Sequence, residues 1–403
     1  MPQLPEPCFD LVVVGGGPAG LATALAASHE GLENIAILES RSGQQRRNNV
    51  LLLDDSIVAG LRQLGVDVSG FSPATSFTFI DGDAGLEYRF PLAGTACDSG
   101  RASVLSMFPR RTPAADVLIS GLEQALLDAI ARRPGIRLLM GVDVTSVSPN
   151  AGGRTIAYLQ SGTENHLHTP LIAICDGAHS SMLELLGVGR VGRRRQEVAM
   201  MANFCQPGRG QIKFQRSKPL EEVLALCSEQ GSTITVRMPL DTDMAGHSNA
   251  EARAGLMRQH AGKLGISGAF ITPPAVVEIS HDRAERCLLD DDIFVLGDAA
   301  RTATPRLGLG ANWAIRDALR FARLLPQIRS GNYLRRKLAL WKFQCRTRLA
   351  TEVLLFQGWM LNRADQRSKK PMPANWRFRQ KSLLMRFMWR AGKGEIQACS
   401  ISR

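Results

Sequence analysis

The pattern of hydrophobic and polar positions predicts two kinds of β-structure. Uninterrupted apolar runs, typical of strands buried on both faces of a parallel sheet, lie within residues 9–14, 34–40 and 292–298. Alternating apolar and polar residues, typical of antiparallel strands, occur in a hairpin pattern at residues 76–90 and repeatedly from about 195 to 282. The pattern therefore predicts an α/β chain that also contains an antiparallel sheet.

Helical segments are predicted between these strands. A helix of small residues follows the first strand at residues 19–31, and a turn leads into an amphipathic helix within residues 48–66. The remaining predicted elements are two long helices, at residues 115–132 and 310–328, and three strands, at 135–141, 154–162 and 168–177.

A glycine-rich turn joins the first predicted strand to its helix. Gly15, Gly17, Pro18, Ala19 and Gly20 belong to a GxGxxG motif in the strand–helix context that binds a dinucleotide. In such motifs the first glycine permits a tight turn, the second lets a pyrophosphate approach the backbone, and the third lets helix and strand pack closely. The helix N-terminus offers N–H donors to the phosphates.

An acidic residue, Glu39, closes the second predicted strand about 20 residues after the loop, where a carboxylate accepts hydrogen bonds from a ribose diol. This favours NAD or the AMP half of FAD over NADP as the ligand of the loop. A structural turn with a surface Glu is the alternative interpretation.

The sequence GDAARTATPRLGLGAN points to FAD. Its strand ends at Gly297-Asp298, which places Asp298 at the carboxyl edge of the sheet, where ligands bind in open α/β sheets. Gly308 and Gly310 permit a planar ring to approach the backbone, and the helix that follows offers positive potential to a reduced flavin. A simple NAD dehydrogenase does not need this second element.

These motifs, in this order over residues 9–330, resemble the single-component flavoprotein aromatic hydroxylases with the p-hydroxybenzoate hydroxylase fold. The resemblance rests on GGGPAG with its Glu, on CDG at residues 175–177, and on Pro305, Gly308, Gly310 and Asn312 with the following Asp-Ala. It implies that FAD lies between the glycine loop and Asp298, with Ala311 also among the cofactor-binding residues. It further implies that NADH or NADPH is the reductant and that O2 reacts with reduced flavin to give a C4a-hydroperoxide.

The resemblance implies a Rossmann-like FAD-binding domain that is interrupted by an antiparallel β-sheet substrate domain and followed by C-terminal helices. A chain of 403 residues also exceeds the roughly 250–300 residues at which a single core stops growing. The FAD-binding domain is assigned to residues 1–70, 111–194 and 283–330, the substrate domain to 71–110 and 195–282, and a basic helical region to 331–403.

The segment Arg-Asn-Asn-Val is similar to the flavin domain of the MICAL proteins. This similarity makes Arg47, Asn48 and Asn49 candidate FAD contacts. The alternative is a helix-capping loop with Asn49 as the N-cap.

Three positions depart from the usual family pattern. Leu183 stands where the DG motif usually has Arg, which bears on the handling of the nicotinamide cofactor. Arg301 replaces a His, and Arg306 follows the motif proline, so both add positive charge near the inferred flavin edge. The alternative for both is a solvent-exposed or salt-bridged arginine.

Charge is concentrated at the C-terminal end. Residues 331–403 hold 17 Lys and Arg against 3 Asp and Glu, whereas the other 330 residues hold 32 basic and 34 acidic residues. The body is therefore near neutral, which argues against nucleic acid as a partner. For the tail, with Trp376 and Trp389 among arginines, one hypothesis is contact with a membrane or an acidic partner. The alternative is a helix packed on the body with its basic side in water.

The eight cysteines form no CxxC motif, and the seven histidines show no metal-ligand spacing, so no metal is expected. Reduced cysteines and an N-terminus without the features of a secretory signal favour a cytoplasmic protein, with membrane-peripheral placement as the tail's alternative.

The sequence therefore predicts an FAD-dependent monooxygenase that hydroxylates or epoxidises a small aromatic or polycyclic substrate, with no catalytic residue identified. An FAD-dependent reductase or dehydrogenase of a lipid or isoprenoid, resembling the geranylgeranyl reductases, is one alternative. A redox-sensing flavoprotein scaffold is another.

Overall fold

The computed structural model describes residues 8–43, 49–83, 85–91, 117–119, 121–218, 221–238, 249–302 and 310–367. A six-stranded sheet, called the central sheet below, forms the core of one end of the molecule. In spatial order the strands are β18 (Leu288–Leu289), β19 (Ile293–Val295), β12 (Ile172–Ile174), β1 (Leu11–Val14), β2 (Ile35–Glu39) and β8 (Ile136–Met140). All neighbouring pairs are parallel except β18 and β19, which confirms the predicted parallel sheet.

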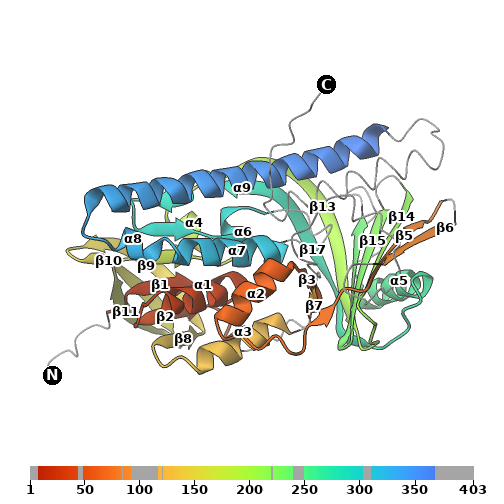
Figure 1. The fold of residues 1–403 in the computed structure, drawn as a ribbon, viewed down its shortest axis with the longest axis horizontal. Helices are drawn as coiled ribbons and strands as arrows, with labels where there is room; N and C mark the ends of the chain where they lie inside the picture. Colours follow the sequence, from red (N-terminus) through yellow and green to blue (C-terminus); the bar gives the residue numbers. More distant parts are fainter. Residues whose placement is uncertain are drawn as a thin grey trace, which may run out of the picture.

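A seven-stranded sheet forms the other end of the molecule (Figure 1). Its strands, in order, are β17 (Phe270–Ala284), β13 (Arg190–Phe204), β16 (Gly231–Met238), β15 (Glu221–Ser228), β14 (Gln211–Lys218), β5 (Ser76–Asp81) and β6 (Leu86–Pro91). The predicted hairpin and the predicted antiparallel strands thus share one sheet, in which only the β14–β5 pair is parallel.

Two smaller sheets complete the β-structure of the described residues. One is antiparallel and contains β9 (Val142–Asn150), β10 (Gly153–Gln160) and β11 (Thr163–Thr169); the other contains β3 (Leu51–Leu53), β7 (Val117–Ile119) and β4 (Ser72–Pro73). The helices are α1 (Pro18–His29), α2 (Asp55–Gln63), α3 (Leu122–Ala131), α4 (Ser181–Leu185), α5 (Ala250–Lys263), α6 (Gly297–Ala300), α7 (Gly310–Ala322), α8 (Leu325–Ile328) and α9 (Tyr333–Arg367).

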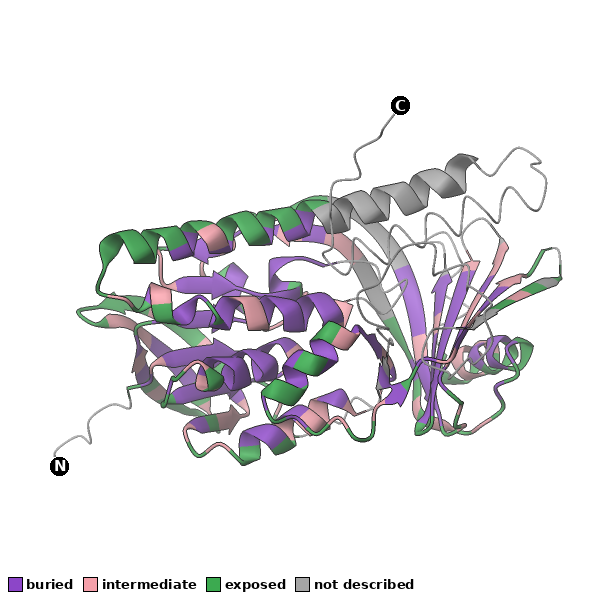
Figure 2. Cartoon of the chain, viewed as in Figure 1, coloured by how far each residue is buried: buried purple, intermediate pink, exposed green. Residues whose placement is uncertain are grey.

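The central sheet is buried on both faces because its strands alternate between two apolar clusters. Leu11 and Val13 of β1 face the cluster formed with α1 and α7, whereas Val12 and Val14 face the cluster formed with β10 and α4. Helix α1 is buried from Ala19 to Ala27, and its small side chains allow close packing between the sheet and the neighbouring helices (Figure 2). This double burial explains the uninterrupted apolar runs in the sequence.

Four local predictions are wrong in detail. Residues 115–132 are not one helix: β7 ends at Ile119, and Gly121, with φ of +73°, is the N-cap of α3, which begins at Leu122. A short strand, β3, precedes α2, and Asp54 rather than Asn49 caps that helix, because its carboxylate accepts from the backbone N–H of Ser56. Helix α5 interrupts the strands predicted between 195 and 282 and packs against their sheet. The strand expected to reach Gly297-Asp298 ends at Val295.

Helix α9 runs along one long edge of the molecule and packs on α7 and the central sheet (Figure 1). Phe343 makes edge contacts with Phe294 and Phe321, at 5.0 and 6.2 Å between ring centroids. Within the part of the chain that the structure describes, no helix has both the length and the apolar character that crossing a membrane requires.

Candidate functional site

The glycine loop after β1 has the geometry that a diphosphate requires. Gly15 adopts φ of +106°, and a Cβ there would run into the carbonyl group of Cys175. A Cβ at Gly20 would overlap the Gly15 carbonyl oxygen, so this glycine lets α1 pack against the loop. A Cβ at Gly17, by contrast, would meet no described atom within 4 Å. Open space therefore lies at the start of α1, where N–H groups without helical partners favour an anion.

Glu39 lies against this loop at the end of β2. Its carboxylate accepts from the backbone N–H of Gly16 at 2.6 Å and from the Arg41 backbone N–H and Nε at 2.9 and 2.8 Å. Burial alone would raise the pKa of Glu39, but the hydrogen bonds from Arg41 and Gly16 lower the pKa below its usual value. The group is therefore an ionised, positioned acceptor beside the loop, as a ribose-binding acid must be.

Asp176 follows β12, the strand beside β1. Its Oδ2 accepts from the Met182 N–H at 3.0 Å, but its buried Oδ1 finds no hydrogen-bond partner among the described residues. Burial raises the pKa of this carboxyl group. An under-satisfied buried acceptor at the mouth of a nucleotide site fits a ligand hydroxyl or a bound water. Leu183, where the family pattern has Arg, is 1% exposed and belongs to the apolar core, so no cation is presented from that position.

The two motifs from opposite ends of the chain meet at α6. Gly297 has φ of +61°, and a Cβ there would lie 2.9 Å from the Cβ of Ala19 on α1. The absence of a side chain thus lets α6 approach the first turn of the glycine-loop helix. Asp298 follows, exposed, beyond the end of β19. The Gly-Asp motif and the first turn of α1 therefore lie in close contact.

Two side chains join α6 to the seven-stranded sheet. Arg190 of β13 donates to the carbonyl oxygens of Ala299 at 2.8 Å and Asp298 at 3.3 Å, and it pairs with Asp282 of β17 at 2.7 Å. Thr302 donates to the same carboxylate at 2.8 Å. The α6 turn is therefore held between the central sheet and the second sheet, the arrangement expected where a cofactor meets a substrate layer.

Comparison with known proteins identifies the group that this site serves. Residues 9–351 match a family model described as an FAD binding domain. The chain belongs to this family. FAD is therefore the cofactor, and the glycine loop, Glu39 and the open space at Gly17 fit its adenosine diphosphate part.

Individual relatives are distant. The FAD-dependent monooxygenase terD of Aspergillus terreus (strain NIH 2624 / FGSC A1156) is 24% identical over 347 residues, which cover 80% of this chain and 54% of terD. The chain thus spans about half the length of that curated relative.

Solved structures show the same fold. The p-nitrophenol 4-monooxygenase PnpA of Pseudomonas putida DLL-E4 has a TM-score of 0.73 at 19% identity and covers 96% of this chain and 95% of its own. The flavin-dependent monooxygenase PieE, solved with FAD and substrate, has a TM-score of 0.72 at 19% identity and covers 98% and 72%.

The side chain of Asn312 forms hydrogen bonds with two backbone groups elsewhere in the chain. Its Oδ1 accepts from the Asp54 N–H at 2.8 Å, and its Nδ2 donates to the Leu52 carbonyl oxygen at 2.6 Å. The Asn312 side chain is thus a buried link between the first turn of α7 and the β3–α2 junction, and its contact with the cofactor stays a prediction. Gly310 and Ala311 begin that turn, where the sequence places the flavin. Arg47, Asn48, Pro305, Arg306 and Gly308 lie outside the described residues, so the predictions for them, and the similarity to MICAL, remain predictions.

Arg301 is buried in an ion pair, which is the salt-bridged alternative for this position rather than added charge at the flavin edge. Its Nη2 donates to both Asp317 oxygens at 2.8 and 2.7 Å, and Asp317 also accepts from the Gly297 N–H at 3.3 Å. The Arg301 side chain is 3% exposed and lies over the Trp313 ring at 5.5 Å. The pair thus joins the end of α6 to α7.

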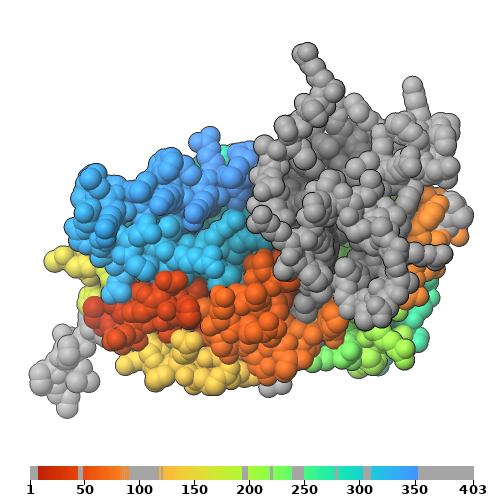
Figure 3. All heavy atoms as spheres, viewed as in Figure 1, coloured from red at the N-terminus to blue at the C-terminus, as the bar shows by residue number. Residues whose placement is uncertain are grey.

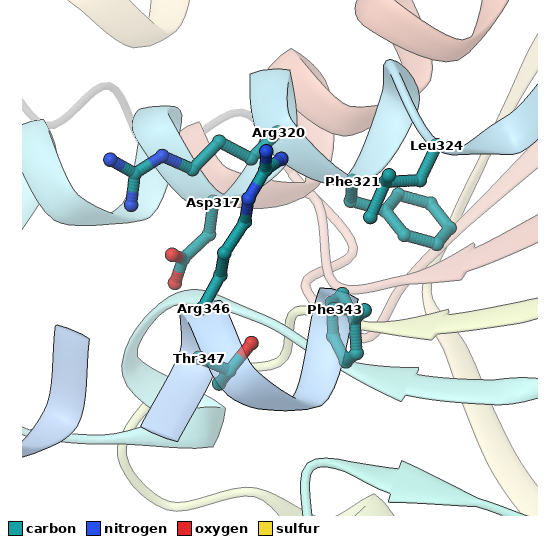
Figure 4. Close-up of a pocket in the computed structure, with 7 residues that line it drawn as sticks. All are labelled: Asp317, Arg320, Phe321, Leu324, Phe343, Arg346 and Thr347. Carbon is teal, nitrogen blue, oxygen red and sulfur yellow. The ribbon is translucent and has the colours of Figure 1, made fainter. Parts of the chain in front are cut away.

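Asp317 also lines a small cavity between α7 and α9, of about 10 Å³ (Figure 4). Arg320 of α7 and Arg346 of α9 also line it, with the apolar rings of Phe321 and Phe343 on its other side. Burial, together with the nearby charge of Arg316, lowers the pKa of Arg320. A space of this size holds about one water molecule, so the cavity is not the flavin site.

A buried polar network at the seven-stranded sheet could not be predicted from the sequence. Asn203 of β13 donates to Asn49 Oδ1 and Thr272 Oγ1, both at 2.9 Å, and accepts from Thr233 at 2.5 Å. Thr233 in turn accepts from the Val50 N–H at 2.6 Å. Asn49, a predicted FAD contact, is thus anchored to the second sheet. The hydrogen-bonded partners are 30 to 183 positions apart in the sequence, so no local pattern could reveal the network.

Proposed function

We propose that the flavoprotein is an FAD-dependent monooxygenase. It uses NADH or NADPH and O2 to hydroxylate or epoxidise a small aromatic or polycyclic substrate. The observation that carries the proposal is the junction at α6, where the glycine-loop helix, the Gly-Asp turn and the seven-stranded sheet converge. The names of the similar proteins, terD, PnpA and PieE, support the reaction type.

The residues assigned to FAD divide between its two ends. Gly15, Gly17, Pro18, Ala19 and Gly20 hold the diphosphate at the start of α1, and Glu39 accepts from the ribose. At the other end, Asp298 and the first turn of α7 hold the ribityl chain and the ring, and the positive end of the helix dipole favours an anionic reduced ring. Bound FAD supplies the chemistry that activates O2 and transfers one oxygen atom to the substrate.

The overall reaction is balanced by the nicotinamide cofactor. Substrate, O2, NAD(P)H and one proton give hydroxylated substrate, NAD(P)+ and water. One oxygen atom enters the substrate and the other leaves as water, with the hydride supplying the two electrons. The chain's own contribution is to bind, to orient and to exclude water between the two sheets.

The test uses the purified full-length holoprotein. We expect a flavin absorption spectrum corresponding to about one FAD per chain, and faster NAD(P)H-dependent flavin reduction when a substrate is bound. With ¹⁸O2, product from an accelerating compound should carry one ¹⁸O atom. A product that forms equally well without O2 would instead establish the reductase alternative. Failure of both NADH and NADPH to reduce the flavin with any candidate would favour the redox scaffold.

We further propose that the basic region 331–403 brings the enzyme to a negatively charged partner. Its support is the concentration of 17 basic residues in this region, against a body that is nearly neutral.

A further inference from the structure

Helix α9 has apolar residues on two opposite faces. The inner face, which includes Ala339, Leu340 and Phe343, is buried against α7 and the central sheet. One apolar stripe is enough to attach a surface helix to a core. A second stripe on the outside therefore needs another explanation.

The outer stripe consists of Leu334, Leu338, Trp341 and Leu349. Their exposed fractions are 75, 48, 59 and 61%. The steps of four, three and eight residues return to the same side of an α-helix, so the four side chains form one line. The stripe spans roughly 22 Å at about 1.5 Å per residue. Burial colouring shows the outward side of α9 as exposed along this part of the helix (Figure 2).

Basic side chains flank the stripe on both sides. By helical spacing, Arg335 and Lys342 follow one side, and Lys337 and Arg348 follow the other. Of these, Lys337 pairs with Asp291 at 2.5 Å. The result is an exposed apolar line between two rows of positive charge.

This charge pattern selects among the partners that could cover the stripe. A second copy of the chain would bring basic rows against basic rows, which repel. The chain's own residues 368–403 hold nine basic residues and one acidic residue, so they carry the same charge. The fitting partner is therefore anionic, with an apolar layer that accepts leucine and tryptophan.

The shape of the surface around α9 narrows the choice of partner further. The described part of α9 lies at the outer boundary of the molecule, where no other described element rises beyond it (Figure 3). A flat partner can therefore contact the whole stripe at once. Leucine and tryptophan on one side of a helix with flanking Lys and Arg is the pattern of helices that lie in a membrane interface.

We propose that the outer stripe of α9 docks the flavoprotein on an anionic lipid membrane. The four apolar side chains enter the headgroup boundary, and the flanking Lys and Arg contact lipid phosphates. The packing of Phe343 on Phe294 and Phe321 keeps the helix in place, so docking needs no folding step. This surface is independent of the FAD site, and its failure would leave the monooxygenase proposal untouched.

Vesicle flotation of the full-length holoprotein tests the proposal. Wild type should float with phosphatidylcholine vesicles that contain phosphatidylserine and remain below vesicles of phosphatidylcholine alone. The double variant Leu338→Ser with Trp341→Ser should lower the bound fraction at least tenfold. The matched control, Leu159→Ser with Leu185→Ser, changes side chains that are 40 and 42% exposed on β10 and α4 and should float like wild type.

Tryptophan quenching by brominated lipid is the second measurement. Wild type should be quenched on anionic vesicles, and Trp341→Phe should lose most of that quenching while still floating. Equal flotation of wild type and the α9 double variant would overturn the proposal, as would wild type that does not float. So would a wild-type dimer on size-exclusion chromatography that the double variant abolishes, because a second copy would then cover the stripe.

Discussion

Replacing Gly17 and Gly20 in turn by alanine separates the two tasks of the glycine loop. The residues are three positions apart, but the structure gives their Cβ positions opposite surroundings: open space at Gly17 and the Gly15 carbonyl oxygen at Gly20. Gly17→Ala should therefore weaken FAD binding without unfolding the apoprotein. Gly20→Ala should destabilise the apoprotein itself.

The magnitudes follow from local geometry. Gly17 has φ of −78° and ψ of −179°, which alanine adopts without strain. A gain of about 0.4–1 kcal/mol from the unfolded state is offset by the poorer N-cap, so stability should change by less than about 1 kcal/mol. Loss of one hydrogen bond to a charged phosphate costs about 1.5–3 kcal/mol, which raises the Kd for FAD roughly 10- to 150-fold. Backbone displacement at Gly20 should cost about 3 kcal/mol or more.

The assay is FAD titration of flavin-free protein, followed by fluorescence quenching and paired with urea unfolding of the same apoprotein. Gly262→Ala on α5 is the control, because its Cβ would also meet open space but lies far from the loop. It should leave the Kd unchanged. If Gly17→Ala binds FAD with the wild-type Kd, the reasoning that places the diphosphate at the start of α1 is refuted.

The remaining predictions concern charges and thiols. Asp317→Asn leaves the Arg301 guanidinium buried without its carboxylate, so urea unfolding should show a loss of about 3–5 kcal/mol, and an Arg301→Met, Asp317→Leu double variant should recover much of it. If the double variant is as unstable as the single one, the loss does not come from an uncompensated charge. For Asp282, burial opposes ionisation, but hydrogen bonds from Arg190 and Thr302 hold its pKa below the usual value. Its stabilising contribution is therefore complete above the unfolded pKa near ~3.9 and is lost as the pH falls through the folded pKa. Wild type should accordingly lose stability in acid more steeply than Asp282→Asn, and parallel profiles would contradict this. Burial raises the pKa of Cys175 to about 12, so native protein treated with iodoacetamide at pH 8 should be labelled at its exposed cysteines and not at Cys175, as read by peptide mass spectrometry. Labelling of Cys175 at the rate of the exposed thiols would show that its site opens.

The local parts of the site could be predicted because the residues that form them lie close together in the sequence. A strand, three spaced glycines, a helix and an acid about 20 residues later define the nucleotide loop without any distant contact. The structure places these elements where the spacing requires. By contrast, residues 115–132 were predicted as one helix, because apolar spacing alone did not reveal that Gly121 would separate β7 from α3.

The partners of other side chains could not be predicted because they are remote in the sequence. The amide of Asn312, a predicted cofactor contact, bonds the backbone of residues 52 and 54, about 260 positions away. Arg301 was expected to leave charge at the flavin edge or to pair, and only the packing of α6 against α7 brought Asp317 to it. The Asn49–Asn203–Thr233 network likewise exists only because two sheets meet.

The sequence by itself determined the cofactor class, the parallel and antiparallel layers and the excess of positive charge near the C-terminal end. Each follows from periodicity, from glycine conformational freedom or from composition, which act within a short stretch of chain. Only the tertiary structure decided which apolar face of α9 is buried, which carboxylate pairs with Arg301, and that Gly297 packs against Ala19. Those outcomes depend on packing between segments far apart in the chain, for which a single sequence carries no local signal.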